Sequence, residues 1–159
     1  PHGSEIDVQR GAADIVWHWS DGNTSTGTAV SKAGLGTGNH DHYVTVSNGS
    51  AVTRFGAANG GGLGHLVSIT GLQNCPYLTI LYAYNEPNLT TVGRTNTTRI
   101  KEYHLMSTAL PALEMDQLFA DAIATTVTNG IFYCANHGTA ASTINQETLV
   151  NNRGWTLNF

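Results

Sequence analysis

The chain has 159 residues, a net charge of −4 and only 11% charged residues. This length is close to that of one ordinary domain, so we expect a single compact body. The 7 Lys and Arg residues form no basic stripe that could neutralise phosphates, which argues against nucleic acid as a partner. No apolar run is long enough to cross a bilayer and residues 1–4 do not begin a secretion signal, so we expect a soluble chain without membrane insertion.

Glycine is concentrated in the first part of the chain, where 14 of the 18 glycines lie within residues 1–71. The apolar run at residues 15–19 leads into Asp21-Gly22-Asn23, which is typical of a hairpin turn because glycine accepts a positive φ. Residues 43–46 predict another strand, and the Gly-rich residues 31–39 predict a loop. Residues 1–50 are therefore predicted to form a short antiparallel β segment.

The second part of the chain contains a repeat. Four short stretches, starting at Phe55, Leu81, Tyr103 and Phe132, share an apolar first residue, a small or apolar third residue and Asn or Ser in fifth place. Their starting points are 26, 22 and 29 residues apart, close to the roughly 20–29 residues of a leucine-rich repeat. The first and third residues are expected to point into the core from a strand, and the fifth to bond the backbone where the chain leaves the sheet.

The segments between these stretches are expected to complete the core and to include helices. A helix is predicted over residues 114–127, because four apolar side chains share one helical face. They are Leu118, Phe119, Ala122 and Ile123. The other core residues expected are Leu63, Leu66, Ile69, Leu72, Leu78, Leu89, Val92, Ile100, Leu110 and Leu113.

A second helix closes the chain. It is predicted to begin at Thr143, whose spacing to Gln146 fits a capping box, and to end before Gly154. Residues 155–157 would then form a terminal strand. The predicted fold class is α+β: an antiparallel β segment in residues 1–50, followed in residues 51–159 by a small leucine-rich-repeat-like parallel β solenoid with two C-terminal helices.

Two segments resemble known families. Residues 115–123 (MDQLFADAI), Asn129-Gly130 and residues 153–157 (RGWTL) resemble the C-terminal end of leucine-rich-repeat-like proteins of bacteriophages, prophages and bacterial surfaces, over roughly residues 52–159. In front of them, residues 17–24 (WHWSDGNT) and 40–46 (HDHYVTV) are similar to an abbreviated PKD-like β module. The resemblance implies adhesion or virion architecture and carries no catalytic residue over to this chain.

The repeat also predicts which side chains face away from the core. If the register is right, Tyr82, Tyr84, His104, Met106 and Tyr133 lie side by side on the outer face of consecutive strands. Aromatic side chains of this kind give large contact areas with a polar tip, as in binding surfaces. The face could bind a ligand, contact another copy of the chain, or only stabilise the sheet through cross-strand pairs.

Metal-binding and catalytic residues are less well indicated. His40 and His42 point to the same face of a strand and could hold a metal together with His18 or Asp21, but packing and hydrogen bonding explain these residues better. The sequence contains no nucleophile elbow, Walker loop or metalloprotease motif. We therefore expect neither catalysis nor a cofactor.

The two cysteines, Cys75 and Cys134, allow one disulfide. Each also suits a small buried apolar position, and the sequence favours this second interpretation.

From these patterns we expect a non-catalytic structural or attachment component of a bacteriophage particle. It would form homo-oligomers or contact other virion proteins, and would meet a glycan or protein receptor on the host surface, so that its location is the virion or the cell surface. One alternative is a domain of a bacterial secreted or surface adhesin that binds glycan or protein. Another is a carbohydrate-active enzyme that uses His18, His40 and Asp21.

Overall fold

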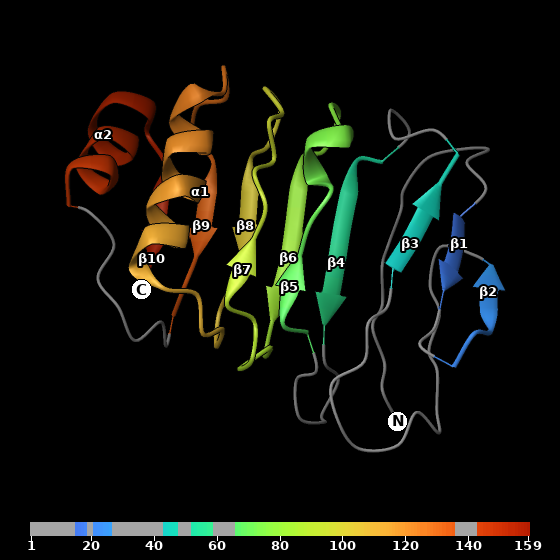
Figure 1. Cartoon of the computed structure of the whole chain (residues 1–159). Coiled ribbons are helices and arrows are strands. Elements are labelled where there is room, and N and C mark those ends of the chain that lie inside the picture. The colour runs from blue at the N-terminus through green and yellow to red at the C-terminus, as the bar shows by residue number, and fades with distance from the viewer. Residues whose placement is uncertain (1–14, 19–20, 27–42, 48–51, 59–65, 136–142) are drawn as a thin grey trace.

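The computed structural model describes residues 15–18, 21–26, 43–47, 52–58, 66–135 and 143–159. Within them the chain combines parallel β-sheets with two α-helices, which confirms a mixed α and β architecture. Figure 1 shows the strands of the largest sheet side by side, with the helices towards the C-terminal end of the row. Neither helix in these residues is long and apolar enough to cross a membrane.

The largest sheet consists of five parallel strands in the order β10-β9-β8-β6-β4. Its strands are β4 (Arg54–Ala58), β6 (Ile80–Tyr84), β8 (Glu102–His104), β9 (Ile131–Tyr133) and β10 (Thr156–Asn158). The register pairs the first residues of the predicted repeats with one another and adds a fifth in β10. In order along the sheet these residues are Phe55, Leu81, Tyr103, Phe132 and Leu157. The alignment of the four repeats is thereby confirmed.

The segments that return from one strand to the next lie on one side of this sheet (Figure 1). The first two contain β5 (Ser68–Ile69) and β7 (Thr91–Val92), which form a second parallel sheet, and a short 3₁₀ helix, η2 (Leu72–Asn74). The later two contain α1 (Ala112–Ala124) and α2 (Thr143–Arg153). The core lies between the main sheet and these return segments.

The inward side chains of β8 and β9 are part of a buried aromatic cluster. Tyr103 and Phe132 are fully buried and stack with ring centroids 4.4 Å apart. Phe119 of α1 meets Phe132 edge-on at 4.6 Å. The indole ring of Trp155 closes this cluster, with its centroid 6.3 Å from that of Tyr103 and 6.4 Å from that of Phe132. It also leaves no room for a side chain on Gly130, whose Cβ would lie 2.6 Å from the ring.

The expected core residues are largely confirmed. Ile69, Leu72, Leu78, Leu89, Val92, Ile100 and Leu110 are buried, and Leu66 packs against the core. The prediction that Leu113 belongs to the core was wrong, because this side chain is 68% exposed. Leu113 lies five residues before the buried Leu118, which places it about 140° around the helix from that residue. Leu63 lies outside the described residues.

Both predicted helices are present with small changes in their ends. The first begins after Pro111, two residues before the predicted start. It ends at Ala124, three residues before the predicted end, and the hydroxyl group of the next residue, Thr125, donates to the Ala122 carbonyl oxygen at 2.8 Å. The second spans the predicted residues, and Gly154 adopts the left-handed φ of 66° expected just past its end. The Thr143 side chain, and with it the capping box, lies outside the described part of the chain.

The fifth residue of the repeat has a different role from the one expected. Asn85 and Ser107 have φ values of 58° and 56°, a left-handed conformation that Asn tolerates better than most residues. Their backbone amides donate to the carbonyl oxygens of Met106 and Ala135, at 3.0 and 3.1 Å. The residue type thus serves the backbone conformation where the chain leaves the sheet. The other two copies, Asn59 and Asn136, fall outside the described residues.

The N-terminal residues that the structure describes form a separate three-stranded sheet in the order β2-β1-β3. Strand β1 (Ile15–His18) pairs antiparallel with β2 (Thr24–Thr26) and with β3 (Tyr43–Val46). The turn between β1 and β2 contains Gly22 with a φ of 81°. Trp19 and the predicted loop at residues 31–39 lie outside the described residues.

Carboxylates tie successive return segments together. Glu86 and Asp121 are buried, and Glu114 is half-buried. They accept hydrogen bonds from backbone amides of the preceding return segment, those of Leu66, Val92 and Thr95 at 3.1, 3.2 and 3.0 Å. A carboxylate that accepts a backbone N–H satisfies a donor that would otherwise be buried without a partner. These bonds therefore hold neighbouring return segments together.

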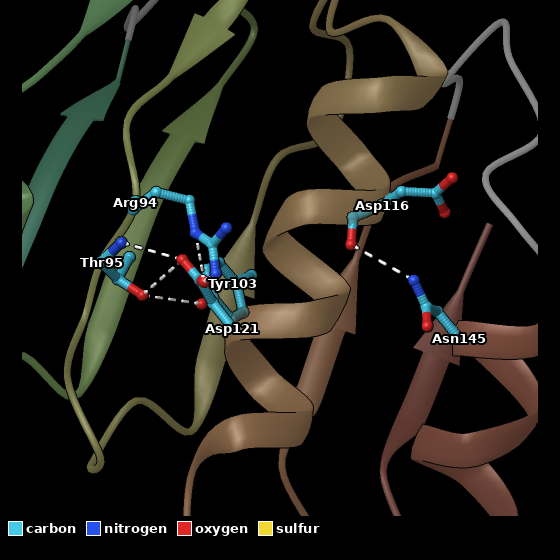
Figure 2. A network of polar contacts seen from close by, with 6 residues as sticks. All are labelled: Arg94, Thr95, Tyr103, Asp116, Asp121 and Asn145. Carbon is cyan, nitrogen blue, oxygen red and sulfur yellow. Dashed lines mark hydrogen bonds and ion pairs between the residues drawn. The ribbon is translucent and has the colours of Figure 1, made fainter.

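Asp121 is the centre of the most extended of these networks (Figure 2). It is only 5% exposed, and forms an ion pair with Arg94 in addition to its hydrogen bond with the Thr95 amide. The Thr95 hydroxyl lies 3.3 Å from both the Asp121 carboxylate and the Tyr103 hydroxyl. The network joins α1 to the return segment before β8 and to the core column of the sheet.

Replacement of Phe132 with alanine is expected to lower the free energy of unfolding by about 3–5 kcal/mol, because it removes a buried ring that contacts Tyr103 and Phe119. Urea denaturation followed by circular dichroism measures the loss. Leu113→Ala is the control and should cost less than about 0.5 kcal/mol, since this side chain is exposed. Equal losses in the two variants would contradict this assignment of the core.

The substitution Asp121→Asn is expected to lower the free energy of unfolding by about 1.5–3 kcal/mol, because hydrogen bonds to a buried carboxylate are lost. The matched control is Glu147→Gln on α2, the same kind of change at an exposed residue. Denaturation of both variants tests the difference, and a larger loss in the control would refute the role of Asp121.

Candidate functional site

The outer face of the main sheet carries the residues that the sequence predicted as a binding surface. In β6, β8 and β9 the side chains alternate, so that Leu81, Tyr103 and Phe132 are buried while their neighbours are only half-buried. All five predicted residues, Tyr82, Tyr84, His104, Met106 and Tyr133, are half-buried. The structure therefore places them on the side of the sheet opposite to the core.

Three of these residues form a continuous row, which we call the aromatic row: Tyr82, His104 and Tyr133. The register places Tyr82 opposite His104, and His104 opposite Tyr133. Their ring centroids are 4.2 and 4.7 Å apart, with interplanar angles of 42° and 32°. These distances are close to the spacing of about 4.8 Å between neighbouring strands, so each ring lies directly beside the ring of the next strand.

The packing of the aromatic row limits what it can bind. Because the rings contact one another across the strands, their faces are turned towards their neighbours and much of each face is covered. A sugar platform needs an open ring face for stacking. The aromatic row instead offers ring edges and polar tips, which suit an extended contact with another protein surface.

Tyr84 and Met106 lie next to the row, towards the ends of their strands. Tyr84 is the last residue of β6, and Met106 is the second residue after β8. The Asn85 amide donates to the Met106 carbonyl oxygen, which keeps the two segments together at this edge.

Charged groups of both signs border the aromatic row. The Glu102 carboxylate lies 3.2 Å from Nε2 of His104 and 3.9 Å from Nζ of Lys101. The Arg54 guanidinium lies over the Tyr82 ring, with Cζ 4.9 Å from its centroid. Arg54 was missed by the sequence analysis, although its place directly before the inward Phe55 puts it on the outer face by alternation.

The metal candidates that the structure describes take part in local structure. His18 is half-buried, and its Nε2 lies 3.1 Å from the Thr45 hydroxyl of the neighbouring strand β3. The Asp21 carboxylate accepts hydrogen bonds from the backbone amide and the side-chain amide of Asn23, at 3.0 and 2.9 Å, as in a turn. No cluster of three metal-ligating side chains occurs among the described residues. His40 and His42 lie outside them, so the predicted site remains a prediction.

The two cysteines are not bonded to each other. Cys134 is fully buried in the inward column next to Phe132, and burial raises the pKa of its thiol to about 12. Cys75 is half-buried and burial raises its pKa as well. A raised pKa disfavours the thiolate, which is the nucleophilic form of cysteine.

No protein-family model matches this chain, and neither the curated proteins nor the solved structures contain a significant match.

Raising the pH from about 8 to 11 is expected to destabilise the fold, because the buried Cys134 keeps its proton while the unfolded thiol, with a pKa of about 8.5, releases it. The contribution of the Cys134 thiol to the free energy of unfolding is fully present below the pKa of the thiol in the unfolded chain. Above that pKa it decreases by about 1.4 kcal/mol per pH unit. Tyr103, whose pKa burial also raises, adds to the loss above about pH 10.

The measurement is the free energy of unfolding at several pH values for the wild type, Cys134→Ala and Cys75→Ala. Cys134→Ala should show a shallower decline between pH 9 and 11, and Cys75→Ala should change it less. An identical decline in the wild type and Cys134→Ala would show that this thiol does not control the alkaline stability.

Proposed function

We propose that the chain is a non-catalytic structural or attachment component of a bacteriophage particle, and that residues 51–159 form a leucine-rich-repeat-like solenoid whose outer sheet face makes contacts between copies of the chain. The observation that supports this proposal is the aromatic row. Tyr82, His104 and Tyr133 lie in register and stay half-buried on the face opposite to the core.

The composition of the outer face favours protein contact. Tyrosine, histidine and methionine together with an arginine form a surface that is large, partly apolar and fitted with polar tips, and such residues are enriched in interfaces. Cross-strand contacts alone would also stabilise the sheet. A contact between copies would also bury these partly exposed side chains, which cross-strand contacts alone leave accessible.

The polar groups of the described core support a non-catalytic role. The buried Asp121 is engaged with Arg94 and Thr95, and the buried Glu86 accepts a bond from a backbone amide. Both carboxylates are thus committed to holding return segments. Under this proposal the protein would reside in the virion or at a cell surface, where other edges of the molecule meet a glycan or protein receptor.

The double substitution Tyr82→Glu and Tyr133→Glu is expected to dissociate the wild-type oligomer, because burying carboxylates in an interface costs several kcal/mol. Light scattering coupled to size exclusion measures the mass. The matched control is Tyr77→Glu with Leu113→Glu, which adds the same charge at exposed sites, 41% and 68% accessible, away from the outer face. Circular dichroism checks that both variants fold.

Dissociation by the first pair alone would support assembly through this face. A monomeric wild type would contradict the homo-oligomer and would favour a ligand-binding adhesin domain. Dissociation by both pairs would point to a general effect of charge and not to the aromatic row.

A further inference from the structure

We propose that Asn129-Gly130 is a site of spontaneous deamidation, and that opening of the last coil controls the rate of this reaction. The last coil is defined as residues 143–158, which contain α2 and β10. The reaction changes the covalent structure of the chain and does not depend on the proposed function. It follows from two packing constraints that meet at this dipeptide.

The fold favours this pair of residues directly before β9. Asn129 has a φ of 57°, a left-handed conformation that asparagine adopts more readily than most residues. Gly130 has no room for a side chain, because a Cβ atom there would lie 2.6 Å from the ring of Trp155. The conformation of the first residue and the packing of the second therefore both select Asn followed by Gly.

Asparagine followed by glycine is chemically labile. The Gly130 amide nitrogen attacks Cγ of Asn129 and loses its proton, the bond from Cγ to the side-chain nitrogen breaks, and ammonia leaves. Glycine favours this attack because it has no Cβ to hinder the approach. Water then opens the cyclic imide at Cγ to give aspartate, or at the main-chain carbonyl carbon to give isoaspartate. Asn129 is exposed, so water reaches it.

The closed last coil hinders the attack. The Asn129 amide donates to the Arg153 carbonyl oxygen and the Thr156 amide donates to the Gly130 carbonyl oxygen, both at 2.9 Å. The Asn129 carboxamide packs against Gly154, where a Cβ atom would lie 2.5 Å from Oδ1. To bring Cγ onto the Gly130 nitrogen, the carboxamide must leave Gly154 and the adjoining peptide must rotate, which disturbs these contacts. The reaction therefore proceeds after the last coil has opened.

The last coil is less firmly packed than the coils before it. Among the described strands, β10 pairs with β9 alone, and its inward residue Leu157 is only half-buried, whereas Tyr103 and Phe132 are fully buried. Of the described side chains of α2, Leu149 alone is buried, compared with five in α1. Segments with fewer buried apolar contacts open at a lower free energy than the rest of a fold.

The products are expected to keep the last coil open. Either product places a carboxylate where the Asn129 carboxamide now packs against Gly154. Isoaspartate also adds one atom to the main chain between the Asn129 amide, which bonds Arg153, and the Ile131 amide, which bonds Lys101. Both bonds cannot then form in their present geometry, so the reaction makes a transient opening permanent.

Peptide mass spectrometry on the full chain, kept in mildly alkaline buffer, measures the rate. Conversion of Asn129 should be at least roughly tenfold slower in the folded chain than in the chain unfolded by urea. Trp155→Phe removes the Nε1–H bond to the Val127 carbonyl oxygen and should raise the folded-state rate roughly tenfold. The matched control Ile69→Val shortens a buried side chain of β5, far along the sheet, and should change the rate by less than about twofold.

Hydrogen exchange at the Thr156 amide tests the consequence for the last coil. In aged wild-type protein this amide should exchange faster in proportion to the converted fraction, because its bond to the Gly130 carbonyl oxygen is lost. Asn129→Gly accepts the left-handed φ and has no carboxamide, so ageing should leave its exchange unchanged.

Each outcome decides part of the proposal. An absence of conversion at Asn129 in the unfolded chain would overturn the site itself. Equal rates in the folded and unfolded chains would overturn control by the fold, and equal acceleration by Trp155→Phe and Ile69→Val would replace opening of the last coil by global unfolding. Acceleration by Trp155→Phe alone, together with faster exchange at Thr156 after ageing, would support the proposal.

Discussion

The residue-by-residue register of the parallel strands is the constraint on which the rest of this structure depends. It stacks Leu81, Tyr103 and Phe132 on one side of the sheet, and Tyr82, His104 and Tyr133 on the other. A slip of one residue in any strand would turn its inward side chains outward. In β8 such a slip would bury Glu102 and His104 and expose Tyr103, so burial and charge both select the observed alignment.

The two sides of the sheet differ in how their polar groups and side chains are shielded from solvent. On the inner side, backbone amides of the return segments need hydrogen-bond partners, and Glu86, Glu114 and Asp121 of the following return segment accept bonds from them. These donors stabilise the two buried carboxylates, Glu86 and Asp121. On the outer side none of the described parts of the return segments covers the sheet. Its side chains are partly shielded by one another, which creates the aromatic row.

The outer face illustrates how packing decides what a group of aromatic residues can do. The same residues with open ring faces would suit stacking on sugars, but rings 4.2 to 4.7 Å apart cover one another. What remains exposed is an arrangement of edges, hydroxyl groups and charges that is ordered across the strands. Arg54, Ile80 and Glu102 lie in register on three neighbouring strands, so the charges on this face have fixed positions.

The sequence by itself determined the features that depend on neighbours along the chain. It determined the alignment of the four repeats, the extent of α2 up to Gly154, and the outward position of all five predicted surface residues, because strand and helix periods and left-handed positions are local properties. Only the tertiary structure decided that the Arg54 guanidinium lies over the Tyr82 ring and that Asp121 joins Arg94, Thr95 and Tyr103. Those contacts join different return segments and strands, and their geometry depends on how irregular return segments of unequal length pack over the sheet, which no local pattern encodes.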